Sequence, residues 1–255
     1  MLNKTSLIGI VAATIAFIAV PAFAAESFLK DGDFVGVTFW IVSVAMWAST
    51  IFFFYEGMKL DAKWRTSLVV AGLVTFIAAV HYMYMREYWV SFGESPVVYR
   101  YIDWLLTVPL LMIEFYLILV AVGAAVSGSV FWRLLVGTLV MLIGGYLGEA
   151  GYISVLLGFI IGMIGWAVII WEIFRGEASQ SASSNAAVSS AFNAMRLIVL
   201  VGWAIYPLGY VFGLMMGSVD DASLNWIYNL ADFINKILFG LIVWNCAQQD
   251  SAAKA

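Results

Sequence analysis

The segment at residues 222–247, ASLNWIYNLADFINKILFGLIVWNCA, places two charges inside an apolar run that is long enough to cross a membrane. A helix needs about 20 residues to span a hydrocarbon core of about 30 Å. Asp232 and Lys236 are four residues apart, so they share one helix face, one turn apart. Charges within a bilayer are costly and usually face the interior of a helix bundle. The segment therefore predicts a bundle of membrane helices with ionisable groups at its centre.

The composition of the whole chain agrees with a membrane protein. Of its 255 residues, 64% are hydrophobic and 11% are charged, whereas a soluble domain is about half apolar and a quarter charged. The net charge of -4 gives no basic field that would attract nucleic acid. Cys246 is the one cysteine and cannot form an internal disulfide. We expect it to pack within the seventh apolar segment.

Six further apolar segments precede the one quoted above. They cover approximately residues 34–56, 63–85, 97–121, 131–148, 152–174 and 189–216. Residues 148–151 predict a tight turn, and the Ser/Ala-rich stretch between Arg175 and Ser190 predicts a flexible loop. Residues 1–24 resemble a cleaved signal peptide, with Lys4 before an apolar run and Ala22-Phe23-Ala24 at its end. We therefore predict an all-α membrane protein with one seven-helix domain at residues 25–255.

Basic residues predict how the chain crosses the membrane, because Lys and Arg collect in cytoplasmic loops. The first, third and fifth connections are the more basic ones, and the opposite connections hold Glu94, Glu149, Asp220 and Asp221, with Arg86 as an exception. We expect the mature N-terminus outside and the C-terminus in the cytoplasm.

Two carboxylates in the third segment extend the pattern seen around Lys236. Asp103 and Glu114 are 11 residues apart, which returns to nearly the same helix face about 16 Å further along the axis. Thr107 lies one turn from Asp103 on that face. A lysine in an apolar pocket is ready for carbonyl chemistry and can form an imine. Acidic groups on both sides of such a lysine are the minimum for a proton path, whereas a structural Asp232–Lys236 ion pair is the alternative.

Other residues near this path have two interpretations each. His81 lies at about the depth of Asp103, where it either tunes the acceptor or makes an ordinary helix contact. Trp203 and Tyr206 precede Pro207, which can kink the sixth segment. These aromatic side chains, with Trp104, either pack helices together or line a cofactor pocket. The residue pattern alone leaves both alternatives open.

Three motifs together resemble those of microbial rhodopsins, and most closely bacterial proteorhodopsins. They are RYIDWLLTVP at residues 100–109, WAIYP at residues 203–207 and DFINK at residues 232–236. The resemblance covers essentially the whole chain. It implies all-trans retinal bound covalently to Lys236, and a light-driven outward proton pump, which is an ion transporter rather than a classical enzyme.

The resemblance also implies roles for individual residues. Asp103 matches the counterion and proton acceptor, Asp232 the second counterion, Glu114 the proton donor, His81 the residue that tunes the acceptor, and Arg100 the arginine beside the counterions. Trp104, Thr107, Trp203, Tyr206 and Pro207 match pocket positions. Leu111 matches the position that tunes colour, where leucine goes with green absorption.

The same resemblance implies a cellular location and binding partners. We expect a bacterial inner membrane, contact with lipid, and a pentameric or hexameric ring with Trp40 and His81 near the interface. A sensory photoreceptor is the alternative function, but it would need a transducer, and no signalling domain is evident in the sequence. A seven-helix transporter without a chromophore is the other alternative.

Overall fold

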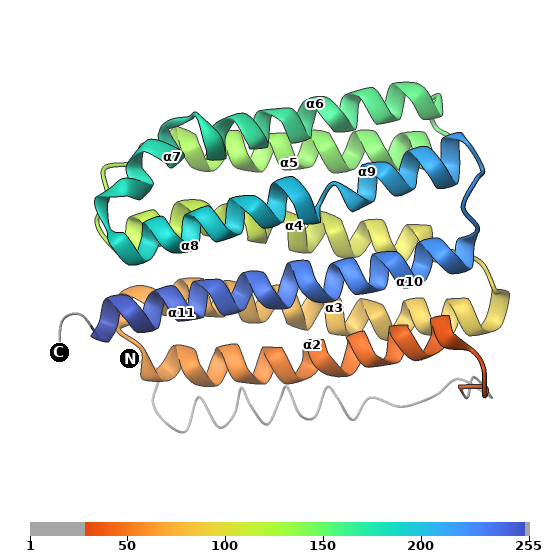
Figure 1. The fold of residues 1–255 in the computed structure, drawn as a ribbon, viewed down its shortest axis with the longest axis horizontal. Helices are drawn as coiled ribbons and strands as arrows, with labels where there is room; N and C mark the ends of the chain where they lie inside the picture. Colours follow the sequence, from red (N-terminus) through yellow and green to blue (C-terminus); the bar gives the residue numbers. More distant parts are fainter. Residues whose placement is uncertain (1–28, 253–255) are drawn as a thin grey trace.

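The computed structural model describes residues 29–252. Within this range seven helical spans are long and apolar enough to cross a membrane, and they lie side by side along one axis (Figure 1). This confirms the predicted all-α fold with seven membrane-spanning helices. The predicted signal peptide lies outside the described residues.

The first four spans are single helices, apart from a short 3-10 turn before the second. Their bounds are α2 (Phe34–Lys59), η1 (Ala62–Trp64) with α3 (Arg65–Phe92), α4 (Val97–Ala121) and α5 (Gly128–Glu149). The last three spans are made of several pieces. The fifth is α6 (Val155–Phe174), α7 (Glu177–Ser181) and η2 (Ala182–Ser184). The sixth is α8 (Ala186–Leu197), η3 (Ile198–Gly202), α9 (Ile205–Gly209) and η4 (Tyr210–Met215). The seventh is α10 (Asp221–Asp232), η5 (Phe233–Leu238) and α11 (Phe239–Ala252).

Short polar side chains fix where several helices begin. Asp33, Ser154, Asn185 and Asp220 each accept a hydrogen bond from a backbone N–H in the first turn, at 2.8–3.3 Å. Such N-caps satisfy donors that have no partner within the helix. The bond from the Ser223 N–H holds the pKa of the exposed Asp220 carboxyl below its usual value.

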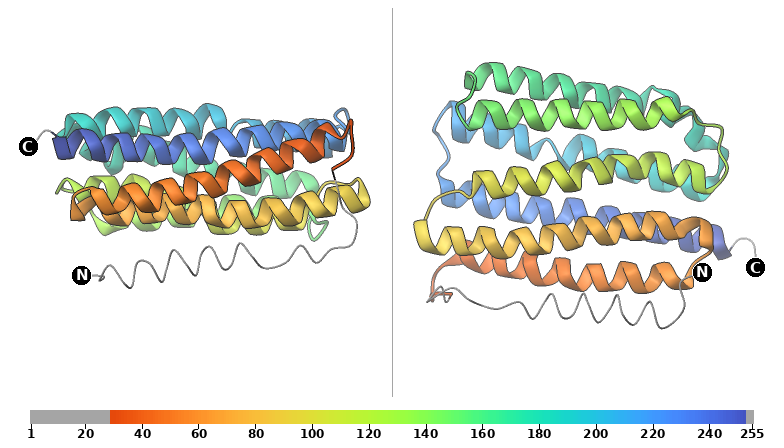
Figure 2. Two further views of the ribbon diagram at one scale, coloured as in Figure 1. Left: turned by 90° about the horizontal axis from the view of Figure 1, so that it is seen from below. Right: turned by 180° about the vertical axis from the view of Figure 1, so that it is seen from behind.

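Consecutive spans pack against each other, and the seventh packs against α2 and α3, so the bundle closes on itself. Because the number of spans is odd, the start of α2 and the end of α11 lie at opposite ends of the bundle (Figures 1 and 2). We call these the Asp33 end and the Ala252 end. Helix α4 runs from the Asp33 end towards the Ala252 end, as does the seventh span.

Two local predictions were wrong. The fourth span continues through Glu149, so the turn covers residues 150–154 instead of 148–151. The stretch after Arg175 is helical over most of its length, in α7, η2 and the start of α8. Alanine favours helix in this stretch, and the Asn185 cap starts α8 within the predicted loop.

The sixth and seventh spans contain π-helical turns, η3, η4 and η5, where bonds reach one residue further than in an α-helix. The Trp203 N–H, for example, donates to Ile198 O at 3.0 Å. Pro207 has no N–H to donate. The sixth span is therefore bent between α8 and α9, as Figure 1 shows. π-Helical turns of this kind occur frequently at functional sites.

Glycines bring α5 and α6 into close contact. A Cβ atom on Gly165 would lie 2.6 Å from Gly137 O, and one on Gly158 would lie 2.8 Å from Gly144 O. Small residues permit this approach of two backbones, which is a common way to pack membrane helices.

We predict that Gly165→Ala lowers the melting temperature, because the added methyl group meets backbone that cannot move aside. We expect the substitution to lower the free energy of unfolding by about 1–3 kcal/mol. Thermal denaturation in detergent, followed by circular dichroism, measures it. Gly128→Ala is the matched control, since no atom lies within 4 Å of its added Cβ. Equal melting temperatures for the two variants would refute this account of the α5–α6 contact.

Candidate functional site

Lys236 lies in η5, at the centre of the bundle, with a carboxylate on each side. Its Nζ donates to Asp232 Oδ2 at 2.8 Å and also to Asp103 Oδ2. The three side chains are 2%, 1% and 0% exposed, respectively. An ammonium group this deeply buried requires compensating negative charge, and the two carboxylates supply it. The predicted pairing with Asp232 is present, and α4 adds Asp103.

Asp232 is held by three further donors. Tyr82 Oη donates to Oδ2 at 2.8 Å, while Tyr206 Oη and Trp104 Nε1 donate to Oδ1 at 2.6 Å and 3.3 Å. These donors come from three different spans. Hydrogen bonds of this kind stabilise the charged form of a carboxylate. Asp232 is therefore built into the structure as a fixed anion.

Asp103 is surrounded differently. Its Oδ1 has no hydrogen-bond partner among residues 29–252. Thr107, one turn along α4, donates to the Asp103 backbone carbonyl at 2.8 Å and not to the carboxylate. Within the described chain, Lys236 is the donor that holds the Asp103 side chain. Of the two carboxylates, Asp103 is thus the one with an oxygen, Oδ1, that accepts no hydrogen bond from the described residues.

Arg100 lies towards the Asp33 end of the same site. Its Nη2 donates to Asn225 Oδ1 at 2.7 Å and to Asn229 Oδ1 at 3.2 Å. The guanidinium carbon lies 5.4 Å from the ring centre of Tyr228 and 5.7 Å from that of Phe39. The buried guanidinium adds a second positive charge on the Asp33 side of the two carboxylates.

Glu149, which the sequence placed near the Asp33 end without a role, lies at the end of α5 and lines the cavity next to Lys236. The hydroxyl of Tyr101 and the charge of Arg100 both act on its carboxyl group. Tyr228 lines the same part of the cavity. Polar groups thus continue from Asp232 towards the Asp33 end.

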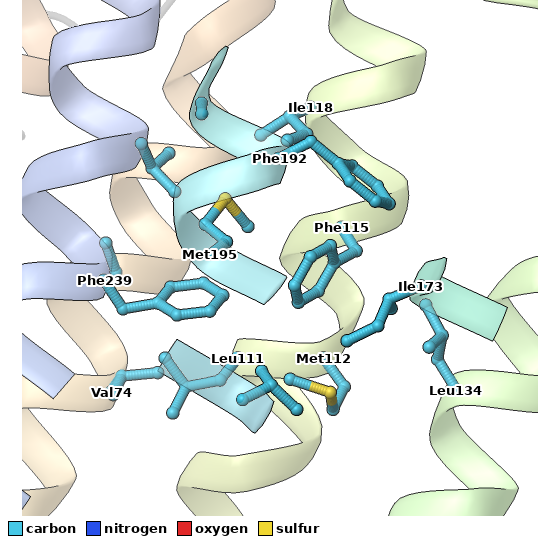
Figure 3. Packing of buried hydrophobic residues seen from close by; sticks show 14 of the residues in the cluster. Val74, Leu111, Met112, Phe115, Ile118, Leu134, Ile173, Phe192, Met195 and Phe239 are labelled. Carbon is cyan, nitrogen blue, oxygen red and sulfur yellow. The ribbon is translucent and has the colours of Figure 1, made fainter. Parts of the chain in front are cut away.

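The region on the Ala252 side of Lys236 is apolar. Phe115 packs edge-to-face on Phe192 and Phe239, with ring centres 4.9 Å and 5.8 Å apart. Figure 3 shows these rings together with Leu111 and Met195. We call these five residues the apolar plug. Leu111 and Phe115 belong to α4, as Asp103 and Glu114 do, so the plug packs beside the stretch of α4 that joins the charged site to Glu114.

Glu114 faces the bundle interior on the buried side of α4, as the spacing from Asp103 predicts. Neither of its carboxyl oxygens meets hydrogen-bond geometry with any group of residues 29–252. The Ser67 hydroxyl on α3 is the polar neighbour that acts on it. A carboxyl group in such surroundings is neutral, because no cation or set of donors stabilises its charge.

A cavity runs from Lys236 between the spans and contains about 880 Å³ of empty space, including the part that opens to the surface. Trp104, Leu111, Trp203, Tyr206, Pro207 and Lys236 all line it. An apolar group bound at the Lys236 nitrogen fits this mostly hydrocarbon and aromatic lining. Every pocket residue expected from the sequence lies on the cavity wall except Thr107, which is buried beside Asp103.

His81 and Trp40 stand apart from this cluster. His81 Nδ1 pairs with Ile77 O at 2.9 Å, and within residues 29–252 no hydrogen bond joins it to Asp103. Trp40 is 41% exposed, and the guanidinium carbon of Arg86 lies 4.8 Å from its ring centre. Cys246 is buried in the hydrophobic core, as expected.

Four polar residues of the site were missed at the sequence level: Tyr82, Asn225, Asn229 and Asn235. Two of them, Asn225 and Asn229, carried a signal. Positions 225, 229, 232 and 236 are spaced four, three and four residues apart, which is one continuous stripe of a helix. The amides could therefore have been placed beside Asp232 and Lys236. Tyr82 and Asn235 had no such pattern.

Comparison with known proteins gives consistent matches. The family model described as bacteriorhodopsin-like protein matches residues 33–249. The green-light absorbing proteorhodopsin of Gamma-proteobacterium EBAC31A08 is 55% identical over 238 residues, which cover 92% of this chain and 95% of that protein. The blue-light absorbing proteorhodopsin of Gamma-proteobacterium Hot 75m4 is also 55% identical, over 239 residues. Overall identity therefore does not distinguish the two colours.

Solved structures agree. The crystal structure of a blue light-absorbing proteorhodopsin from Med12 is 52% identical, with a TM-score of 0.74, and the match covers 85% of this chain and 99% of that one. Xanthorhodopsin, described as a light-driven ion pump with dual chromophore, is 27% identical with a TM-score of 0.77 over 89% of this chain.

Proposed function

Because the chain belongs to the bacteriorhodopsin-like protein family, we propose that it is a light-driven pump that moves protons outward across a membrane. The observation that carries this proposal is the arrangement along α4 and η5. Lys236 lies between the acceptor position of Asp103 and the isolated carboxyl group of Glu114. The relatives at 55% identity are proteorhodopsins, and nothing in them or in the site favours a sensory function.

The proposed chromophore is all-trans retinal, held through an imine to Lys236 Nζ. When bound there it would absorb visible light and change shape, and so supply the energy for transport. Trp104, Leu111, Trp203, Tyr206 and Pro207 line the space that would hold it. Lys236 and Asp232 line the same cavity, so an imine nitrogen there would lie beside the carboxylates that accept from the lysine.

The proposed roles of the two carboxylates in proton transfer are supported by their different surroundings. Asp103 takes the proton from the Lys236 nitrogen, because its Oδ1 is free and no further donor holds its charge. Asp232 stays ionised, because Tyr82, Trp104 and Tyr206 all donate to it. Arg100 stabilises the Asp232 anion from the Asp33 end. Thr107 fixes the turn of α4 that carries Asp103.

Glu114 is the proposed donor that returns a proton to the Lys236 nitrogen. It is neutral and buried, so it holds a proton ready to give. At rest the apolar plug separates it from Lys236, which prevents the proton from returning by the wrong route. The plug must loosen during the cycle before Glu114 can act.

The direction of transport depends on the orientation of the chain. The excess of Lys and Arg in the first, third and fifth connections supports a cytoplasmic Ala252 end and an outer Asp33 end. Asp103 then passes its proton outward, and Glu114 is refilled from the cytoplasm. We propose a bacterial inner membrane as the location.

Three finer features complete the proposal. His81, at about the depth of Asp103, tunes the proton affinity of that carboxylate. Exposed Trp40, stacked on Arg86, lies at the interface of a pentameric or hexameric ring with His81 nearby. Leu111 on the cavity wall favours green absorption.

We predict that illuminated cells that contain the chain and retinal acidify their medium. Asp103→Asn should abolish this acidification, because it removes the acceptor, and Lys236→Ala should lack a visible absorption band. A pH electrode and an absorption spectrum measure the two effects. A protonophore should cancel the signal from the unchanged protein. The absence of any light-induced pH change would disprove the pump.

We predict that Glu114→Gln slows proton return to the Lys236 nitrogen by about 100-fold and leaves the first transfer to Asp103 unchanged. Flash spectroscopy of the retinal-loaded protein separates the two steps. Glu177→Gln is the control, since Glu177 is an exposed carboxylate near the Ala252 end that bonds Ser127. A cycle of normal length in Glu114→Gln would remove Glu114 as the donor.

We predict that Leu111→Gln moves the absorption maximum to shorter wavelength, because a polar side chain would enter the cavity wall. The spectrum of retinal-loaded protein measures this shift. Leu106→Gln is the matched control on the same helix, since Leu106 is exposed on the outside of the bundle. An equal shift in both variants, or none in Leu111→Gln, would show that position 111 does not set the colour.

A further inference from the structure

Asn235 joins the sixth and seventh spans next to Lys236. Its side chain is buried, with 3% exposed, in η5. Its Nδ2 donates to Gly202 O at 3.2 Å and to Tyr206 Oη at 3.3 Å. An amide nitrogen has two hydrogens, so both bonds can form together. Both partners lie at the bend of the sixth span.

Gly202 needs this partner because of the bend. In a regular helix the Tyr206 N–H would donate to Gly202 O, but here it donates to Trp203 O at 3.1 Å. Pro207, the next residue, has no N–H. Asn235 replaces the missing donor. A Cβ on Gly202 would run into the Asn235 side chain, so glycine and asparagine fit together as a pair.

Tyr206 links the same amide to the charged site. Its hydroxyl accepts from Asn235 and donates to Asp232 Oδ1 at 2.6 Å. Asp232 in turn accepts from Lys236 at 2.8 Å. Bonds in such a chain polarise one another. A change of charge at Lys236 therefore alters the bonds that reach the Gly202 carbonyl.

The part of the sixth span beyond the bend is α8, and it supplies Phe192 and Met195 to the apolar plug. Figure 3 shows both side chains over Phe115. A small change of angle at Gly202 would move these two residues away from Phe115. This movement would open the path between Glu114 and Lys236.

We propose that Asn235 is a positioning residue that couples the proton on the Lys236 nitrogen to the bend of the sixth span, and through it to the opening of the apolar plug. The proposal rests on the proposed pump function. The coupling explains how loss of the proton from the Lys236 nitrogen makes the proton donor Glu114 accessible.

Flash spectroscopy of Asn235→Leu tests the coupling, because leucine keeps the volume and removes both bonds. We expect proton return from Glu114 to slow by about tenfold while transfer to Asp103 changes by less than about twofold, as loss of coupling between contacting groups predicts. Ile234→Ala, in the same π-helical turn but exposed on the outside, should leave both steps unchanged. Equal slowing of both steps, or of neither, would overturn the proposal.

A second measurement uses the retinal-free protein and does not depend on light. Gly202→Ala should lower its melting temperature, because the new methyl group displaces the Asn235 side chain. In an Asn235→Ala background the same substitution should have a much smaller effect, since the space is already free. If the two substitutions lower the melting temperature additively, the contact between Gly202 and Asn235, on which the proposal rests, is disproved.

The failure of the pump function and the failure of the coupling can be told apart. If the unchanged protein with retinal shows no light-driven cycle, the pump function fails. If it cycles but Asn235→Leu behaves like Ile234→Ala, the coupling alone fails.

Discussion

The buried positive charge of Lys236 is the constraint on which the rest of the structure depends. Burial of an unpaired ammonium in a bundle of hydrocarbon helices would be prohibitively costly. The site holds two carboxylates, Asp103 and Asp232, and two cations, Lys236 and Arg100, so it is neutral when all four are ionised. A proton that moves from Lys236 to Asp103 leaves this balance unchanged. The transfer therefore needs no new net charge in a medium of low dielectric constant.

The surrounding helices give the two carboxylates different hydrogen-bond partners. Asp232 accepts hydrogen bonds from three different spans, through Tyr82, Trp104 and Tyr206. The fold therefore stabilises its negative charge. Among residues 29–252 Asp103 Oδ1 has no hydrogen-bond partner, and the proposed transfer changes the charge of this carboxylate. Similar carboxylates thus acquire different roles because of their neighbours, and the fixed anion retains an attraction for the next proton on Lys236.

Much of this site follows from the sequence, because helix geometry is regular over one span. The spacing of Asp103 and Glu114, and of Asp232 and Lys236, places each pair on one face without knowledge of any other helix. The resemblance added the chromophore, which residue chemistry alone could not name. Contacts between distant spans could not be predicted in this way. The bond of Asn235 to Gly202 depends on a π-helical turn in each of two spans, and neither turn has a pattern in the sequence. The helical stretch after Arg175 was missed because its composition suits a loop as well as a helix.

The two halves of the bundle differ, and this difference gives transport its direction. Towards the Asp33 end the charged site continues into polar groups, with Arg100, Asn225, Asn229 and Glu149. Towards the Ala252 end it meets the apolar plug, which packs on α4 around Phe115, the residue after Glu114. A proton released at rest therefore has polar partners on one side and hydrocarbon on the other. Net transport requires the plug to open only after the proton has left Lys236, and the bent sixth span is the element that reaches both the plug and the charged site.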